Sequence, residues 1–164
     1  MAEKAFWKQG LIVGMIGAVT VALWFFLIDL VLGRPLFTPA ALGSVLFLGV
    51  RDLEMVEVTA PVVLGYTLLH LAAFIVLGAL VIAIVRRIRK RPPLVLGALL
   101  VFVVLQTLFL GMVVILAEFL LGALAWWAIA VGNLLAALSM GYFVWEKDPS
   151  LQKGLDREPF DPTH

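Results

Sequence analysis

Four long runs of apolar residues dominate this sequence and restrict the folds that it can adopt. The runs extend over residues 10–32, 62–85, 94–120 and 123–145. A helix as long as the first run measures roughly 35 Å at 1.5 Å per residue, enough to cross a hydrocarbon core of about 30 Å. We therefore predict an all-α fold, a bundle of four transmembrane helices with these bounds.

The composition favours lipid, rather than water, as the solvent around these runs. Apolar residues make up 63% of the 164 residues and charged residues 14%, whereas soluble domains carry about 45–50% and about 25%. A water-soluble fold of this length would leave large apolar patches exposed. The sequence contains no cysteine, which excludes disulfide bonds, thiolate metal sites and cysteine nucleophiles.

The placement of the basic residues predicts the orientation in the membrane. Of the 12 Lys and Arg residues, only Arg34 and Arg51 lie between the first and second runs. The others lie near the termini or between the second and third runs: Lys4, Lys8, Arg86, Arg87, Arg89, Lys90, Arg91, Lys147, Lys153 and Arg157. Because cytoplasmic segments are rich in Lys and Arg, we place both termini in the cytoplasm. We expect residues 146–164 to form a disordered cytoplasmic tail.

The basic segment between the second and third runs has two interpretations. Its cations are Arg86, Arg87, Arg89, Lys90 and Arg91. Such a segment determines topology, and it is also a candidate contact for anionic lipid headgroups. We expect the lipid bilayer to be its partner and expect no binding of nucleic acid.

The connection between the first and second runs contains a recognisable segment. Thr38 and Pro39 are typical of an N-cap and a first-turn proline, and they predict a short interfacial or re-entrant helix over about residues 39–50. Residues 22–47 read ALWFFLIDLVLGRPLFTPAALGSVLF. This stretch, with its GRPLFTP segment, resembles small uncharacterised bacterial inner-membrane proteins with four helices. The resemblance covers about a sixth of the chain and implies the bacterial inner (cytoplasmic) membrane, but it transfers no activity, cofactor or functional residue.

Ionisable side chains inside a membrane are costly and mark candidate functional sites. Six polar residues of the outer half of the predicted bundle form a candidate polar pocket for a proton, a cation or a small polar ligand: Asp29, Tyr66, Thr67, His70, Glu118 and Asn133. Four of them also have a structural interpretation. Asp29 pairs with Arg34 at the end of the first helix, Glu118 faces water at headgroup level, and His70 and Asn133 form hydrogen bonds between helices.

These residues do not match a metal centre or a catalytic constellation. A bis-histidine haem site needs two histidines in the membrane, and the second histidine of the chain is His164, in the predicted tail. One histidine and two shallow carboxylates lack the helical spacing of a zinc or di-metal site. The serines have no nucleophile-elbow motif. We therefore predict no cofactor, no metal and no enzymatic activity.

Small residues recur at every fourth position on two of the predicted helices. They are Gly10, Gly14, Ala18 and Ala22 in the first run, and Ala128, Gly132 and Ala136 in the fourth. Such stripes let helix backbones approach closely, either inside one bundle or against a partner. We expect a non-enzymatic accessory or structural subunit that associates with other membrane subunits or with itself. The alternative is a small transporter, or an ion- or proton-handling protein, that uses the polar pocket.

Overall fold

The computed structural model describes residues 2–88 and 126–147, and this part of the chain is all-helical. Its helices are α1 (Ala2–Val31), α2 (Phe37–Gly43), α3 (Ala60–Ile88) and α6 (Trp126–Glu146). A π-helical turn, Ser44–Leu48, continues α2, and a 3₁₀ turn, Leu53–Met55, lies in the loop before α3. The predicted span 94–120 and residues 148–164 of the predicted tail lie outside the described residues.

Three of the described helices are long and apolar enough to cross a membrane. They are α1, α3 and α6, and they contain most of the first, second and fourth apolar runs. The first helix begins at Ala2 instead of the predicted Gly10. The preceding sequence, AEKAFWKQ, contains neither glycine nor proline and includes several good helix formers, so the helix extends beyond the apolar run.

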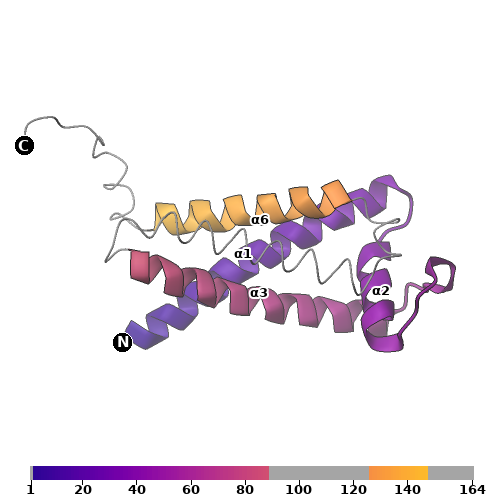
Figure 1. Cartoon of the computed structure of the whole chain (residues 1–164), viewed down its shortest axis with the longest axis horizontal. Helices are drawn as coiled ribbons and strands as arrows, with labels where there is room; N and C mark the ends of the chain where they lie inside the picture. Colours follow the sequence, from indigo (N-terminus) through magenta and orange to yellow (C-terminus); the bar gives the residue numbers. More distant parts are fainter. Residues whose placement is uncertain (1, 89–125, 148–164) are drawn as a thin grey trace, which may run out of the picture.

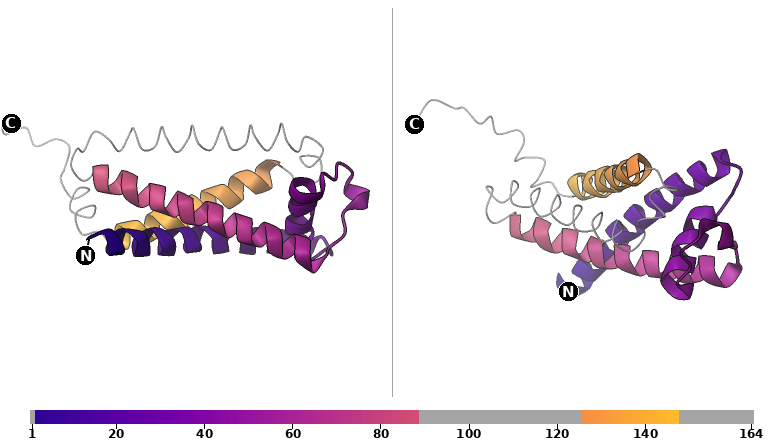
Figure 2. Two further views of the ribbon diagram at one scale, coloured as in Figure 1. Left: turned by 90° about the horizontal axis from the view of Figure 1, so that it is seen from below. Right: turned by 45° about the vertical axis from the view of Figure 1, so that its right-hand side comes forward.

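Helix α1 packs against both α3 and α6, which run antiparallel to it. Figure 1 shows α1 crossing α3, with α6 beside them, and Figure 2 shows the same arrangement from two other directions. All three helices contribute to a core near the end where α1 begins, formed by Val13, Ile82, Met140 and Val144. A second core at the opposite end joins Ala41 of α2 to Ile129 of α6.

Glycine allows the backbones of α1 and α3 to touch. A Cβ atom on Gly78 would lie 2.8 Å from the Cα of Gly14, and one on Gly10 would lie 2.9 Å from a backbone atom of α3. Larger side chains at these positions would force the helices apart, so small residues set this crossing. Gly10, Gly14 and Ala18 of the predicted stripe are buried, whereas Ala22 is exposed to the surroundings.

The second predicted stripe faces α1. Ala128, Gly132 and Ala136 are all buried. The indole Nε1–H of Trp24 donates to the carbonyl oxygen of Ala128 at 2.8 Å, and a Cβ atom on Gly132 would lie 2.9 Å from Cδ1 of Trp24. Both stripes therefore pack largely inside the described bundle, and partner docking would need other surfaces.

The short helix α2 lies across the end of the long helices at which α1 finishes (Figure 1). It starts at Phe37, two residues before the predicted start, and its helical extension ends at Gly49, where φ is +67°. A Cβ atom on Gly43 would lie 2.8 Å from the carbonyl oxygen of Val62, so α2 rests directly on the first turn of α3. This crosswise contact fixes the position of the loop that precedes it.

Candidate functional site

The turn after α1 determines where the predicted site residue Asp29 lies. Gly33 has φ +70°, its N–H donates to the carbonyl of Leu30 at 3.1 Å, and the N–H of Arg34 donates to the carbonyl of Asp29 at 2.9 Å. This pair of bonds is the Schellman motif that ends many helices at a glycine. The chain thereby reverses and returns toward the last turn of α1.

The carboxylate of Asp29 joins the end of α1 to the start of α2. The side chain is buried, with 1% of its surface exposed. Its Oδ2 accepts a hydrogen bond from the backbone N–H of Thr38 at 2.7 Å, and its Oδ1 accepts one from the Thr38 hydroxyl at 2.7 Å. The first N–H groups of a helix lack partners, and the helix dipole favours a negative charge there. Asp29 therefore acts as the cap of α2 from another helix.

Two predictions about this junction were wrong. Thr38 is not the N-cap, because α2 begins at Phe37 and the preceding Leu36 occupies the cap position with φ +64°. Thr38 lies inside the first turn and acts as a donor. Arg34 was predicted to pair with Asp29, but its guanidinium carbon lies 4.1 Å from the ring centroid of Phe37. The Asp29 carboxylate instead binds the two Thr38 donors at the start of α2.

His70 faces α1 from the middle of α3. Its Nε2 lies 3.3 Å from the carbonyl oxygen of Ala18, so the tautomer protonated at Nε2 donates to that oxygen. The ring stacks on Tyr66, with centroids 6.0 Å apart, and contacts Phe74 at 4.7 Å. Tyr66 and His70 share a helix face, as their spacing indicates. The contact with Ala18 is the helix-to-helix hydrogen bond that the sequence suggests as one interpretation of His70.

The other predicted pocket residues do not join this cluster through any described contact. Thr67 is exposed, and its hydroxyl donates to the carbonyl of Val63 in its own helix at 2.7 Å. Asn133 is half-buried in α6, and its Nδ2 has no hydrogen-bond partner in the described part of the chain. Glu118 lies outside the described residues, as do Arg89, Lys90 and Arg91 of the predicted headgroup contact.

Sequence reasoning missed three polar residues that join α1 to α6. Besides Trp24, these are Thr20 and Ser139, whose hydroxyl oxygens lie 3.2 Å apart. The Thr20 hydroxyl also lies 2.8 Å from the carbonyl of Ile16, and that of Ser139 lies 3.0 Å from the carbonyl of Ala136. The sequence could have indicated them, because hydroxyl and indole groups within apolar helices need hydrogen-bond partners on neighbouring helices.

Within residues 2–88 and 126–147, the structure contains no group of three or more His, Cys, Asp or Glu side chains that could hold a metal ion. Comparisons with family models, curated proteins and solved structures find no match for this chain. The resemblance of residues 22–47 to bacterial inner-membrane proteins therefore stays a prediction. The geometry of the described residues carries the functional argument.

Proposed function

We propose that this chain is a non-enzymatic accessory or structural subunit of the bacterial inner membrane, with four transmembrane helices and cytoplasmic termini. The length and apolar composition of α1, α3 and α6 support the membrane placement. Lys4, Lys8, Arg86, Arg87 and Lys147 belong to the end where α1 begins and where α3 and α6 finish. This bias toward one end supports the cytoplasmic orientation.

The ends of the described helices support a fourth crossing. Helix α3 finishes beside the start of α1, whereas α6, which is also antiparallel to α1, starts at the opposite end. Residues 89–125 connect these two ends and contain the apolar run 94–120. A chain that returns through hydrocarbon satisfies its backbone hydrogen bonds best as a helix. We therefore retain residues 94–120 as the proposed third span.

The observation that supports the structural role is that Asp29 and His70, two of the predicted pocket residues, have hydrogen-bond partners within the chain. Asp29 binds Thr38, and His70 lies at hydrogen-bond distance from α1. A transport site needs polar groups that exchange partners with a ligand, whereas these groups hold helices together. The same contacts leave long apolar helix faces exposed, which suit lipid or neighbouring subunits.

The experiment uses the absence of cysteine from the natural sequence. A Glu54→Cys variant should react with a membrane-impermeant maleimide on intact cells, whereas a Lys4→Cys variant should react only after lysis. Labelling of the Lys4→Cys variant from outside would overturn the orientation. After gentle detergent extraction, native mass spectrometry should show an oligomer or co-purified membrane subunits, and a clean monomer would count against the accessory role.

The unpaired Nδ2 of Asn133 favours the alternative of an ion- or proton-handling protein, because a buried amide without a partner is costly. Vesicles loaded with a pH-sensitive dye test it directly. If the role is structural, vesicles that contain the protein should show the same proton flux as empty vesicles. The Asn133→Leu variant should then be at least as stable as the natural chain. A proton flux that Asn133→Leu abolishes would favour transport instead.

A further inference from the structure

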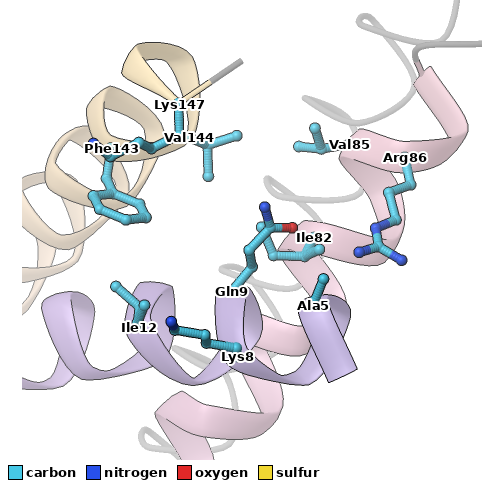
Figure 3. A pocket seen from close by; sticks show the side chains of 10 residues that line it. All are labelled: Ala5, Lys8, Gln9, Ile12, Ile82, Val85, Arg86, Phe143, Val144 and Lys147. Atoms are coloured by element: carbon cyan, nitrogen blue, oxygen red, sulfur yellow. The ribbon is translucent and has the colours of Figure 1, made fainter. Parts of the chain in front are cut away.

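A cleft of about 370 Å³ opens between α1, α3 and α6 at the end of the bundle where α1 begins. Its apolar lining consists of Ala5, Ile12, Ile82, Val85, Phe143 and Val144, and its polar lining of Lys8, Gln9, Arg86 and Lys147. Figure 3 shows the amide of Gln9 pointing into the space between the helices. The volume is within the range of about 300–1,000 Å³ that is usual for small-ligand sites.

The charges of this cleft select an anion. Three of its four polar lining residues are cationic, Lys8, Arg86 and Lys147, and none of the ten lining residues is acidic. The carboxyl ends of α3 and α6 each carry a partial charge of about −0.5, and the amino end of α1 about +0.5. The three full side-chain charges outweigh these partial charges, so binding of an anion here depends on the side chains.

Arg86 is held in place at the cleft. Its guanidinium carbon lies 4.8 Å from the ring centroid of Phe6, a cation–π contact between α3 and α1. Arg86 is half-buried, whereas Lys8 and Lys147 are exposed and free to adjust to a ligand. A guanidinium presents a planar fork of N–H donors that matches phosphate oxygens, and an ammonium acts as a mobile point charge. In Figure 3 the three cations lie at different helices around the cleft, so Arg86 supplies the fixed donor and the two lysines must move toward a phosphate bound there.

We propose that this cleft binds one anionic phospholipid of the cytoplasmic leaflet. Arg86 holds its phosphate together with the ammonium groups of Lys8 and Lys147, and the start of an acyl chain lies between Ile82 of α3 and Phe143 of α6. A soluble phosphate would use only the cations, whereas a lipid uses both the cations and the apolar wall. This inference rests on the proposed membrane placement and adds a specific ligand site to it.

The test is native mass spectrometry of the full chain in mild detergent, titrated with phosphatidylglycerol or with phosphatidylcholine of identical acyl chains. One phosphatidylglycerol should bind at least tenfold more tightly than phosphatidylcholine. A basic residue near a lipid surface contributes about a fivefold change in affinity. The double variant Lys8→Gln/Lys147→Gln should therefore lose about 25-fold, and Arg86→Gln about fivefold.

The matched control for Arg86→Gln is Lys4→Gln, which removes one exposed charge from the same end without altering the lining. It should bind phosphatidylglycerol like the natural chain, and an equal loss would overturn the site in favour of diffuse attraction. A Gln9→Trp variant fills the cleft without changing the charge, and it should abolish the binding of phosphatidylglycerol. If millimolar inorganic phosphate displaced phosphatidylglycerol completely, the proposal that a lipid is the ligand would be overturned. Because the assay is done in detergent, its outcome is independent of the labelling that tests orientation.

Discussion

Replacing Asp29 with alanine removes both acceptors of Thr38 at the start of α2. Thr38 is 3% exposed, so its N–H is left without an acceptor, which costs about 1–3 kcal/mol. Loss of a helix cap alone costs about 1 kcal/mol. Part of this loss is offset, because the variant no longer pays the cost of removing a carboxylate from water. We expect the free energy of unfolding to fall by about 1–3 kcal/mol.

Two further substitutions separate the charge of Asp29 from its hydrogen bonds. In Asp29→Asn, one oxygen still accepts from the Thr38 N–H while the amide donates to the hydroxyl, so the loss should be about 1 kcal/mol, from charge assistance alone. Thr38→Val removes only the hydroxyl. In the Asp29→Ala background that hydroxyl has already lost its partner, so the double variant should be about 1–2 kcal/mol more stable than additivity predicts.

The assay is reversible unfolding in mixed micelles, followed by helical circular dichroism as the denaturing detergent fraction rises. The matched control is Asp52→Ala, because Asp52 also accepts a backbone N–H, that of Glu54 at 3.0 Å, but is exposed. It should lose less than about 0.5 kcal/mol, since an exposed N–H regains water. If Asp29→Ala were as mild as Asp52→Ala, the argument that this carboxylate fixes α2 would be refuted.

Three further predictions use the same unfolding measurement. Gly14→Val should lower the free energy of unfolding by about 3 kcal/mol, because a Cβ there meets the backbone of α3, whereas Gly141→Ala, with open space around it, should be neutral or stabilising. Gly33→Ala should cost about 1 kcal/mol from its φ of +70°, and a result equal to that of Gly141→Ala would remove the conformational explanation. Trp24→Phe should cost about 0.6–1.7 kcal/mol through its lost bond to α6, while Trp7→Phe, at a 58% exposed position, should change little; equal losses would contradict the role of the indole N–H.

The long helices were predictable because an apolar run of membrane length has few other stable structures. The amino-terminal extension of α1 was missed because hydropathy ends at Gly10, whereas helix propensity continues to Ala2. The end of α1 at Gly33 has a local cause, because the structure shows the hydrogen bonds of a Schellman motif there. Apolar runs therefore place the long helices but not all of their ends, and the third proposed span rests on the sequence alone.

The described contacts do not join all the residues of the predicted polar pocket, and the reason is geometric. Sequence gives the depth of a residue along a helix, but the rotation of each helix about its axis depends on its neighbours. Thr67 is one position from Tyr66, yet it faces outward while Tyr66 stacks on His70. The partner of Asp29 was missed because the cap of α2 comes from another helix, and the capping rules search only the residues just before a helix.

The described hydrogen bonds explain how the rotation of α1 is set. Hydrophobicity cannot orient a helix in lipid, because every apolar face suits the solvent equally well. Trp24 donates a hydrogen bond to Ala128 of α6, and Asp29, further along α1, accepts hydrogen bonds from Thr38 of α2. His70 adds a contact with α1 from α3. Rotating α1 would break all of them together, so a few polar residues, each worth about a kilocalorie, select one packing among many apolar ones.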